Sequence, residues 1–441
     1  MGSRTPRLCC CCLVATALVL TACGPRAERA DRRPSDLEAY VAGHAANGDF
    51  SGIVLVTRQG KTLFEKAAGL ASRSFDVPIR SDTRFLVASV TKTFTAAGIE
   101  MLRQQGKLKI EDGLDAYVPD FPHAGKIQLL HLLLHQSGLS DPDYGAIVAR
   151  NVTPDELVRM IGAKPLLFAP GSDSRYSNAG YVTLARVIER VDGRSFDRFL
   201  RESVFDRLGM ADSGTLRSGE VVPRLAEGYV PGVGEAFLRA GPFDPSSLFG
   251  SGNVYGTARD LDRWLTAIDR HELFDIDKQP YPFGWGRRDW FEKNVLVQSG
   301  IVDGYSSIIL TVPAEELHLV VVMNTQSGFT GDEGKTLLGI VLGTPAPVPA
   351  RRGAPPVLPR ATLDRWAGEY LWGAPRYPMH LTSDGSVLTL RWGDSPSAVT
   401  LTPIGEAEFF DRTSFSRIRF RDNGLVWVQN GEETAANRVP S

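Results

Sequence analysis

The fold and a candidate chemistry are both indicated by an apolar run that leads into a serine and a lysine, Phe85-Leu86-Val87-Ala88-Ser89-Val90-Thr91-Lys92. Apolar side chains continue at helical spacing, which predicts a helix over about residues 89–105 that ends at Gly106. Two side chains three residues apart on a helix lie on one face, about 5–6 Å apart at Cβ. Burial would lower the pKa of Lys92, which could then accept the serine proton. The alternative is a solvated helix start, but the apolar residues on both sides favour a buried one.

A second candidate segment, Tyr176-Ser177-Asn178, follows a short polar stretch and opens a predicted helix over residues 178–191. A tyrosine in a cleft near a lysine can act as a phenolate-type general base. Asn178 can offer its amide to the lysine or to a substrate carbonyl. The alternative is a helix cap made by Ser177 or Asn178 with Tyr176 packed beside it, and both interpretations can hold together.

The third candidate segment is Gln298-Ser299-Gly300, which follows the expected strand Val295-Leu296-Val297. A glycine on a strand lets a ligand backbone approach closely, although it can also mark a plain bulge.

Together the three segments resemble the serine β-lactamase and penicillin-binding-protein-like hydrolases, nearest the class C β-lactamase and esterase branch. That family has S-x-x-K, then Y-x-N, then a K-T-G or H-x-G strand. The resemblance spans residues 36–343, and four further segments match in order: 132–139, 168–171, 208–210 and 252–260. It implies an α/β fold, β-lactamase-like, with an antiparallel sheet, flanking helices and a helical lobe over about residues 110–250.

The resemblance also implies roles for individual residues. Ser89 would be the nucleophile and Lys92 its base, while Tyr176 would pass protons to the leaving group. Asn178 would orient Lys92 and the substrate. The amides of Ser89 and Ile301 would form an oxyanion hole.

The strand made by Gln298, Ser299, Gly300 and Ile301 would bind the substrate. Gln298 departs from the family, which has lysine or histidine there, because glutamine carries no charge. This departure favours neutral esters or amides over β-lactams and D-Ala-D-Ala peptides. His131, where the family usually has arginine, is a milder departure.

We therefore expect a metal-independent serine hydrolase that forms an acyl-enzyme on Ser89 with an ester, an amide or a D-amino-acid peptide. The alternatives are a D-alanyl carboxypeptidase or β-lactamase proper, and a catalytically weakened ligand-binding lipoprotein of the same fold. The partner would be a small-molecule or peptide substrate, such as one derived from peptidoglycan. No cofactor is expected, and no metal, because His131 and His135 lack the glutamate and third ligand of a zinc site. His135 is expected to brace the turn at residues 136–138.

The chain has 441 residues with 49 basic and 51 acidic side chains, a balance that excludes a globally basic nucleic-acid binder. Residues 1–22 resemble a lipoprotein signal peptide, and Leu20-Thr21-Ala22-Cys23 resembles a bacterial lipobox, so lipidation of Cys23 is expected. An ordinary signal peptide is the alternative. Residues 23–36 would form a tether, which predicts a bacterial extracytoplasmic lipoprotein, anchored by lipid on the periplasmic side or at the outer membrane. All five cysteines lie at or before residue 23, so no later disulfide is possible.

Beyond the hydrolase-like domain, expected at residues 37–343, the composition changes. Residues 344–360 hold six prolines and predict a stiff linker. Residues 361–436 resemble the lipocalin-like domain that often follows such hydrolases, and five short alternating strands predict a small barrel or sandwich. Its tryptophans, Trp366, Trp372, Trp392 and Trp427, are expected to pack the core rather than form a sugar platform.

Overall fold

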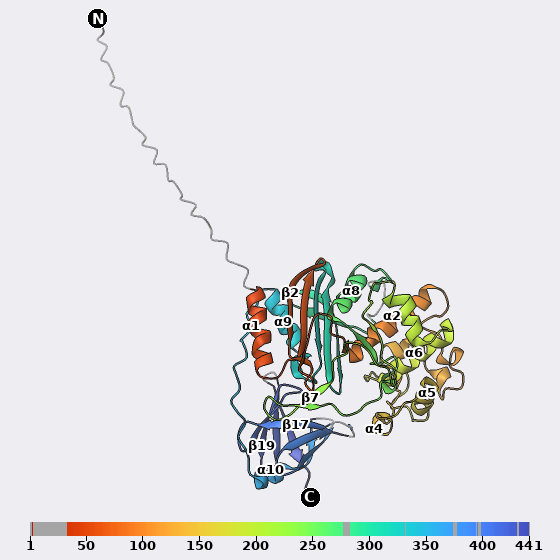
Figure 1. Ribbon diagram of the computed structural model, residues 1–441. Helices are drawn as coiled ribbons and strands as arrows, with labels where there is room; N and C mark the ends of the chain where they lie inside the picture. Colours follow the sequence, from red (N-terminus) through yellow and green to blue (C-terminus); the bar gives the residue numbers. More distant parts are fainter. Residues whose placement is uncertain are drawn as a thin grey trace. The chain divides into compact units, whose positions relative to one another are not determined.

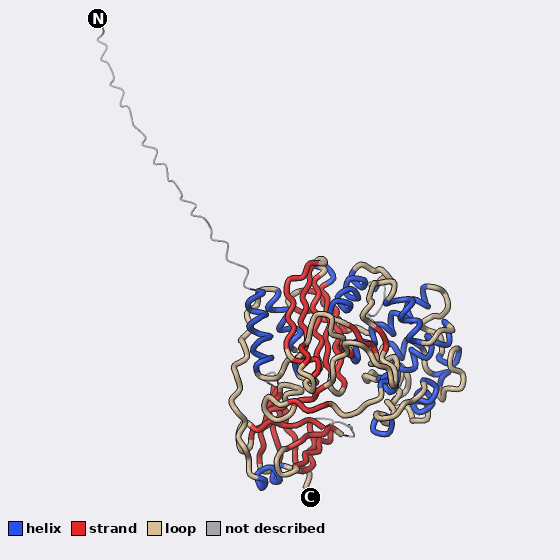
Figure 2. The backbone as a smooth tube through the Cα atoms, viewed as in Figure 1, coloured by secondary structure: helices blue, strands red, loops and turns tan. Residues whose placement is uncertain are grey.

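A six-stranded antiparallel sheet joins the two ends of the hydrolase-like domain in this computed structural model (Figures 1 and 2). The structure describes residues 33–276, 283–330, 332–373, 377–393, 398–429 and 432–440, together with residues 2 and 395. The strand order is β10-β11-β12-β13-β1-β2. The strands are β1 Gly52–Arg58, β2 Lys61–Ala68, β10 Gly286–Trp290, β11 Lys293–Val302, β12 Tyr305–Val312 and β13 Leu317–Met323. The β-lactamase-like α/β fold expected from the sequence is confirmed.

Strand β1, which lies between β13 and the edge strand β2, is buried on both faces, and its side chains alternate between two cores. Val54 and Val56 face helices α1 (Arg33–Ala46) and α9 (Glu333–Val341), which cover one side of the sheet (Figure 1). Ile53 and Leu55 face the core that holds α8 (Ala258–Asp269) and α2 (Thr91–Gln104). Two buried faces explain why the strand is apolar throughout rather than at alternate positions.

A helical lobe packs beyond α2 and carries the second candidate segment at the start of α6. Gly98 of α2 lies against Ile188 of α6, where an added Cβ would come within 2.8 Å of the isoleucine Cδ1. A π-helical turn at Arg201–Phe205 follows α7 directly. The lobe helices are α3 Leu129–Leu133, α4 Tyr144–Ile147, α5 Pro154–Gly162, α6 Asn178–Asp192 and α7 Phe196–Leu200. Short strands border the lobe and the sheet: β3 Leu70–Ser72, β4 Val77–Pro78, β5 Phe85–Leu86, β6 Gly214–Thr215, β7 Tyr229–Pro231, β8 Phe237–Arg239 and β9 Val254–Gly256.

The C-terminal module is a closed barrel in which eight strands follow one another in chain order. Helix α10 (Arg360–Trp366) precedes it. The strands are β14 Gly368–Trp372, β15 Tyr377–Ser383, β16 Leu388–Trp392, β17 Ala398–Pro403, β18 Glu408–Asp411, β19 Ser416–Arg421, β20 Gly424–Gln429 and β21 Glu432–Arg438. Three of these, β14, β18 and β21, were not among the five strands expected. Strand β18 joins β17 to β19, and the pairing of β14 with β21 closes the barrel.

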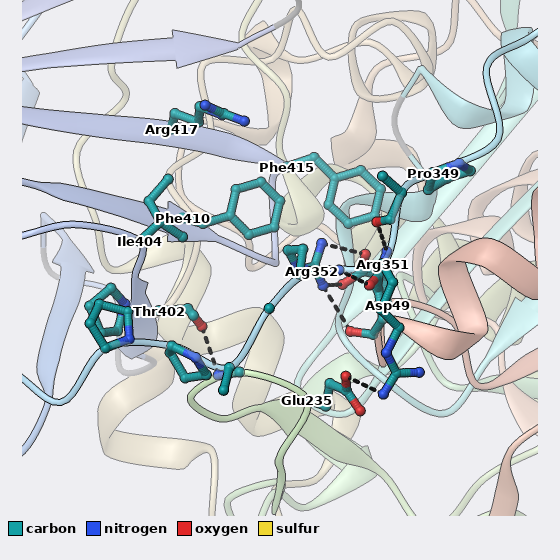
Figure 3. A pocket seen from close by; sticks show the side chains of 18 of the residues that line it. Asp49, Glu235, Pro349, Arg351, Arg352, Thr402, Ile404, Phe410, Phe415 and Arg417 are labelled. Carbon is teal, nitrogen blue, oxygen red and sulfur yellow. Dashed lines mark hydrogen bonds and ion pairs between the residues drawn. The ribbon is translucent and has the colours of Figure 1, made fainter.

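Buried ion pairs tie the linker and the barrel to the start of the hydrolase-like domain. Arg352 of the linker donates to Asp49 at 2.8 Å, beside a cavity shown in Figure 3. Arg412, in the turn between β18 and β19, is fully buried; it pairs with Asp49 at 3.4 Å and donates to the Ala236 carbonyl at 2.8 Å. Fully buried charges persist where they are paired and hydrogen-bonded, so these contacts fix the turn in place. Residues 33–441 accordingly form one compact unit.

Apart from residue 2, the predicted signal peptide lies outside the described residues, as do Cys23 and most of the predicted tether. Helix α1 begins at Arg33 and so takes in the last four residues that we assigned to the tether. In the part of the chain that the structure describes, no helix is both long and apolar enough to cross a membrane.

Candidate active site

Ser89 lies in a single 3₁₀ turn, Ala88–Val90, directly before α2. The helix therefore starts two residues later than the sequence predicts. Ala88 has a φ of +47°, a left-handed conformation that is uncommon for a residue with a side chain. The carbonyl of Val87 accepts a hydrogen bond from Ser307 Oγ at 2.7 Å, which holds this strained turn against β12.

Lys92 is fully buried beneath Ser89, with its amine at the centre of the site. Nζ lies 2.9 Å from Ser89 Oγ, 2.8 Å from Asn178 Oδ1 and 2.8 Å from the Ser251 carbonyl oxygen. Burial lowers the pKa of Lys92 to about 7, against an opposing effect of the Asp141 charge. A substantial fraction of the lysine is therefore neutral at neutral pH.

The contacts of the amine decide where its lone pair points. A neutral amine has two N–H donors and one lone pair. The amide oxygen of Asn178 and the carbonyl of Ser251 can only accept, so they take the two N–H groups. The lone pair then faces Ser89 Oγ, which is the arrangement a general base needs.

Tyr176 brings a proton donor to the other side of the serine. Its hydroxyl donates to Ser89 Oγ at 2.8 Å, although the residue as a whole is 55 % exposed. Burial of the hydroxyl raises the pKa of Tyr176 to about 12, despite the hydrogen bond to Ser89, which lowers it. The phenolate-type base expected from the sequence is thus disfavoured, and the phenol stays protonated.

His135 holds the segment that carries Tyr176. The two rings stack with centroids 4.6 Å apart, and His135 Nδ1 accepts from the Ser177 amide at 3.1 Å. Burial and the nearby Lys92 lower the pKa of His135 to about 4, so the ring is neutral and Nδ1 is free to accept. Its side chain therefore braces the tyrosine segment rather than the turn at residues 136–138 that we expected.

Asp141 fixes the orientation of Asn178 and was missed by the sequence analysis. Its carboxylate accepts from Asn178 Nδ2 at 3.2 Å, from the Ala179 amide at 2.8 Å and from Ser177 Oγ at 3.2 Å. Because a carboxylate can only accept, the NH₂ of Asn178 must face Asp141 and its oxygen must face Lys92. The sequence signal was slight, since Asp141 is one acidic residue shortly after the 132–139 segment.

Strand β11 forms the opposite wall and contributes backbone and a neutral amide. Gln298 Nε2 donates to the Ser89 carbonyl at 3.2 Å. A Cβ at Gly300 would lie 2.6 Å from the Ser89 amide nitrogen, so only glycine permits this approach. The next residue, Ile301, is 51 % exposed at the end of the strand. Ser299 is exposed, and strand alternation turns its side chain to the face opposite Gln298 and Gly300.

The structure thus gathers Ser89, Lys92, Tyr176, Asn178 and Gln298 by direct hydrogen bonds, and it places Gly300 against the Ser89 backbone. The contact between Lys92 and the Ser251 carbonyl was not expected, because any residue type can supply a backbone carbonyl and the sequence therefore does not indicate it. Among the described residues, no group of three histidine, cysteine, aspartate or glutamate side chains is suited to a metal ion.

Comparisons with known proteins agree on one family. A family model described as beta-lactamase matches residues 37–342. The chain is 28% identical over 434 residues to penicillin-binding protein 4* of Bacillus subtilis (strain 168), covering 88% of this chain and 95% of that protein. Over 233 residues it is 29% identical to the teichoic acid D-alanine hydrolase of Staphylococcus aureus (strain MRSA252), covering 52% of this chain and 56% of that protein.

A solved structure, the octameric penicillin-binding protein homologue from Pyrococcus abyssi, matches with a TM-score of 0.62 and 20% identity. The match covers 91% of this chain and 99% of the other. At that identity the likeness shows a shared fold. Because the match covers 91% of this chain, it extends past the hydrolase-like domain into the C-terminal module.

Proposed function

This chain belongs to the beta-lactamase family of serine hydrolases, and from that premise we propose that it cleaves a neutral ester or amide through an acyl-enzyme on Ser89. The observation that carries the proposal is the environment of Lys92. Its two N–H groups are taken by Asn178 and Ser251, and its lone pair faces the serine 2.9 Å away. A buried amine with a pKa of about 7 suits a base that works near neutral pH.

In the acylation step, Lys92 takes the proton of Ser89 as Oγ attacks the substrate carbonyl carbon. The new bond from Oγ to carbon leaves negative charge on the carbonyl oxygen. The amides of Ser89 and Ile301 would donate to that oxygen, with Gly300 allowing the close approach. Backbone donors held in place before the reaction stabilise such charge without reorganisation.

Collapse of this intermediate breaks the bond to the leaving group, which needs a proton. Tyr176 supplies it from a phenol that lies 2.8 Å from Ser89 Oγ. The phenolate left behind regains a proton from the Lys92 ammonium, which returns both groups to their starting forms. Water then attacks the acyl-enzyme with the same groups in reversed roles.

The substrate class follows from Gln298. Its side chain is uncharged, and its NH₂ donates to the Ser89 carbonyl, so this position offers no cation to a substrate carboxylate. An ester or amide without a free carboxylate next to the scissile bond suits this wall. An ester of D-alanine is one such compound, and a relative of this chain is named as a teichoic acid D-alanine hydrolase.

The test compares p-nitrophenyl acetate turnover by the natural chain and by Ser89→Ala, with mass spectrometry of the acid-quenched proteins. We expect serine-dependent release of p-nitrophenol and an acetyl group on the peptide that contains Ser89. Turnover that survives in Ser89→Ala would remove the proposal. Faster cleavage of a D-Ala-D-Ala peptide or a penicillin than of neutral esters would instead favour the carboxypeptidase or β-lactamase alternative. Binding of peptidoglycan fragments without any adduct would favour the weakened lipoprotein.

We also propose that the mature protein begins at Cys23 and is held by lipid at the extracytoplasmic face of a bacterial membrane. The lipobox-like segment at residues 20–23 supports this. In cell fractionation, Cys23→Ser should move the protein from the membrane to the soluble fraction. A membrane-bound Cys23→Ser protein would contradict lipidation as the anchor.

A further inference from the structure

One end of the C-terminal barrel is lined by aromatic side chains that point inward. Trp372 on β14, Tyr377 on β15, Trp392 on β16 and Trp427 on β20 each lie two residues from a buried core side chain of the same strand. Because side chains alternate along a strand, all four face the barrel interior. They therefore form one layer at the end of the barrel core.

This layer lines an open cavity at the barrel end. The cavity has a volume of about 400 Å³, within the range of small-ligand sites, and polar side chains of Thr413, Ser414 and Gln429 share its lining. The ring of Trp392 lies edge-to-face with Trp372 at 5.6 Å and with Trp427 at 5.3 Å between centroids. Core packing, which the sequence predicts for these tryptophans, holds for the buried Trp427 but only in part for Trp372 and Trp392.

One buried donor in this layer has no acceptor among the described residues. The indole N–H of Trp372 is buried, and within the described part of the chain no acceptor lies at hydrogen-bond distance. Buried indole N–H groups usually have a partner, as Trp366 shows near α10, where Nε1 donates to the Glu406 carbonyl at 2.9 Å. A ligand oxygen that enters beside the Trp372 ring would supply the missing acceptor.

The described lining of the cavity carries no unpaired charge. None of its described lining residues is a lysine or an arginine. The buried carboxylate of Asp411 is taken by the amide and hydroxyl of Thr413, each at 2.7 Å, and by Ser414 Oγ at 2.5 Å. Among these described residues an anionic ligand would find no cation, and a cationic ligand would find a carboxylate that already accepts several hydrogen bonds.

The larger cavity in Figure 3, about 1110 Å³, differs in this respect. Its charged groups are paired with one another, Arg351 with Glu235 and Arg352 with Asp49, and these pairs hold the linker in place. We therefore interpret it as part of the interface between the linker, the barrel and the hydrolase-like domain.

We propose that the aromatic end of the barrel binds a sugar ring of a neutral glycan. A pyranose has a C–H face that packs on aromatic rings and hydroxyl or acetamido oxygens that can accept from the Trp372 N–H. A quaternary ammonium group would also suit an aromatic wall, but it has no acceptor for that donor. This inference concerns the barrel alone and is independent of the reaction proposed at Ser89.

Isothermal titration calorimetry with the purified full chain tests it, with cellotriose, mannotriose and chitotriose as probes. We expect saturable binding of at least one trisaccharide, with a Kd of about 1 mM or tighter. Saturation by none of the three would overturn the proposal. So would saturation by tetramethylammonium chloride in place of the sugars.

Two variants locate the site. Trp372→Phe keeps an aromatic ring but removes the N–H, and it should weaken binding about tenfold. Tyr377→Ala removes a ring that is 47 % exposed at the rim, so it should weaken binding without unfolding the barrel, which a thermal melt checks. Trp290→Phe, on β10 of the sheet, is the matched control and should bind as the natural chain does. Natural affinity in both Trp372→Phe and Tyr377→Ala would place the sugar elsewhere and overturn the proposal.

Discussion

The two walls of the candidate active site differ in the number of side chains that they place around Ser89. The helical-lobe wall places the side chains of Asn178 and Tyr176 against Lys92 and Ser89. Both residues belong to one segment, which Asp141 and His135 hold in turn. The sheet wall offers a glycine, exposed backbone and the neutral Gln298. The residues that would activate Ser89 are all in contact with one another. The cation that would contact a substrate carboxylate in this family is replaced by Gln298.

This contrast separates chemistry from selectivity. Changes on the lobe wall should alter the rate with every substrate, because they act on the proton of Ser89. Changes on the sheet wall should alter the rate of one substrate class relative to another, except where they move the Ser89 backbone itself.

Replacing Lys92 should have the largest effect. Lys92→Met keeps the volume of the side chain but removes the base, so kcat/KM for p-nitrophenyl acetate should fall at least about 10³-fold. The natural enzyme should lose activity as the pH falls below about 7, because protonation of Lys92 occupies the lone pair that faces Ser89. Stopped-flow acylation between pH 5 and 9 measures both effects.

Lys61→Met, an exposed lysine on β2, controls for the loss of positive charge and should behave as the natural chain does. A Lys92→Met enzyme that retains a tenth of the natural rate would assign the proton transfer to another group.

Gly300→Ala should have the second-largest effect. Although it lies on the sheet wall, it should lower the rate with every substrate, because it moves the Ser89 backbone. The added Cβ would lie 2.4 Å from the Val87 carbonyl oxygen and 2.6 Å from the Ser89 nitrogen, so backbone must shift. We expect about a 10²-fold loss of kcat for all substrates, comparable with the loss of an oxyanion donor, and a lower Tm. Gly241→Ala, where an added Cβ meets nothing within 4 Å, is the matched control. Full activity in Gly300→Ala would show that β11 does not shape the oxyanion site.

Much of this arrangement could be predicted from local sequence. The apolar run before Ser89, the strand at residues 317–323 and the Tyr176 segment each show their structure in a few neighbouring residues. The barrel strand β21 could not be predicted in this way. Its sequence, Glu-Glu-Thr-Ala-Ala-Asn-Arg, has no apolar alternation, and pairing with β20 and β14 makes it a strand.

The parts of the site that were missed depend on contacts between distant residues. Asp141 reaches Asn178 across 37 positions, and the Ser251 carbonyl reaches Lys92 across 159. The protonated state of Tyr176 was also missed, because burial of its hydroxyl comes from the folded lobe and not from its neighbours in sequence.

Asp141→Asn should have an intermediate effect. The new NH₂ would face the NH₂ of Asn178 or the Ala179 amide, donor against donor, which frees the Asn178 amide to turn its NH₂ toward Lys92. Loss of such a buried charged hydrogen bond corresponds to about a 10-fold to 100-fold lower kcat/KM. Because the Asp141 charge raises the pKa of Lys92, the acid limb of the pH profile should also move to lower pH. Asp143→Asn, exposed two residues later, should change neither quantity, and an unmoved limb in Asp141→Asn would reduce Asp141 to a structural role.

Gln298→Lys should have the smallest effect on the ester reaction and the clearest effect on selectivity. A lysine there gives up the hydrogen bond to the Ser89 carbonyl, so turnover of a neutral ester should fall a few-fold. It also places a cation on the sheet wall, so kcat/KM for a D-Ala-D-Ala peptide with a free carboxylate should rise about tenfold through a lower KM. The ratio of the two kcat/KM values is the measurement, and Gln105→Lys, exposed at the end of α2, is the control. If this ratio is the same in Gln298→Lys and in the natural chain, another part of the site binds the carboxylate, and the difference between the two walls does not set the substrate class.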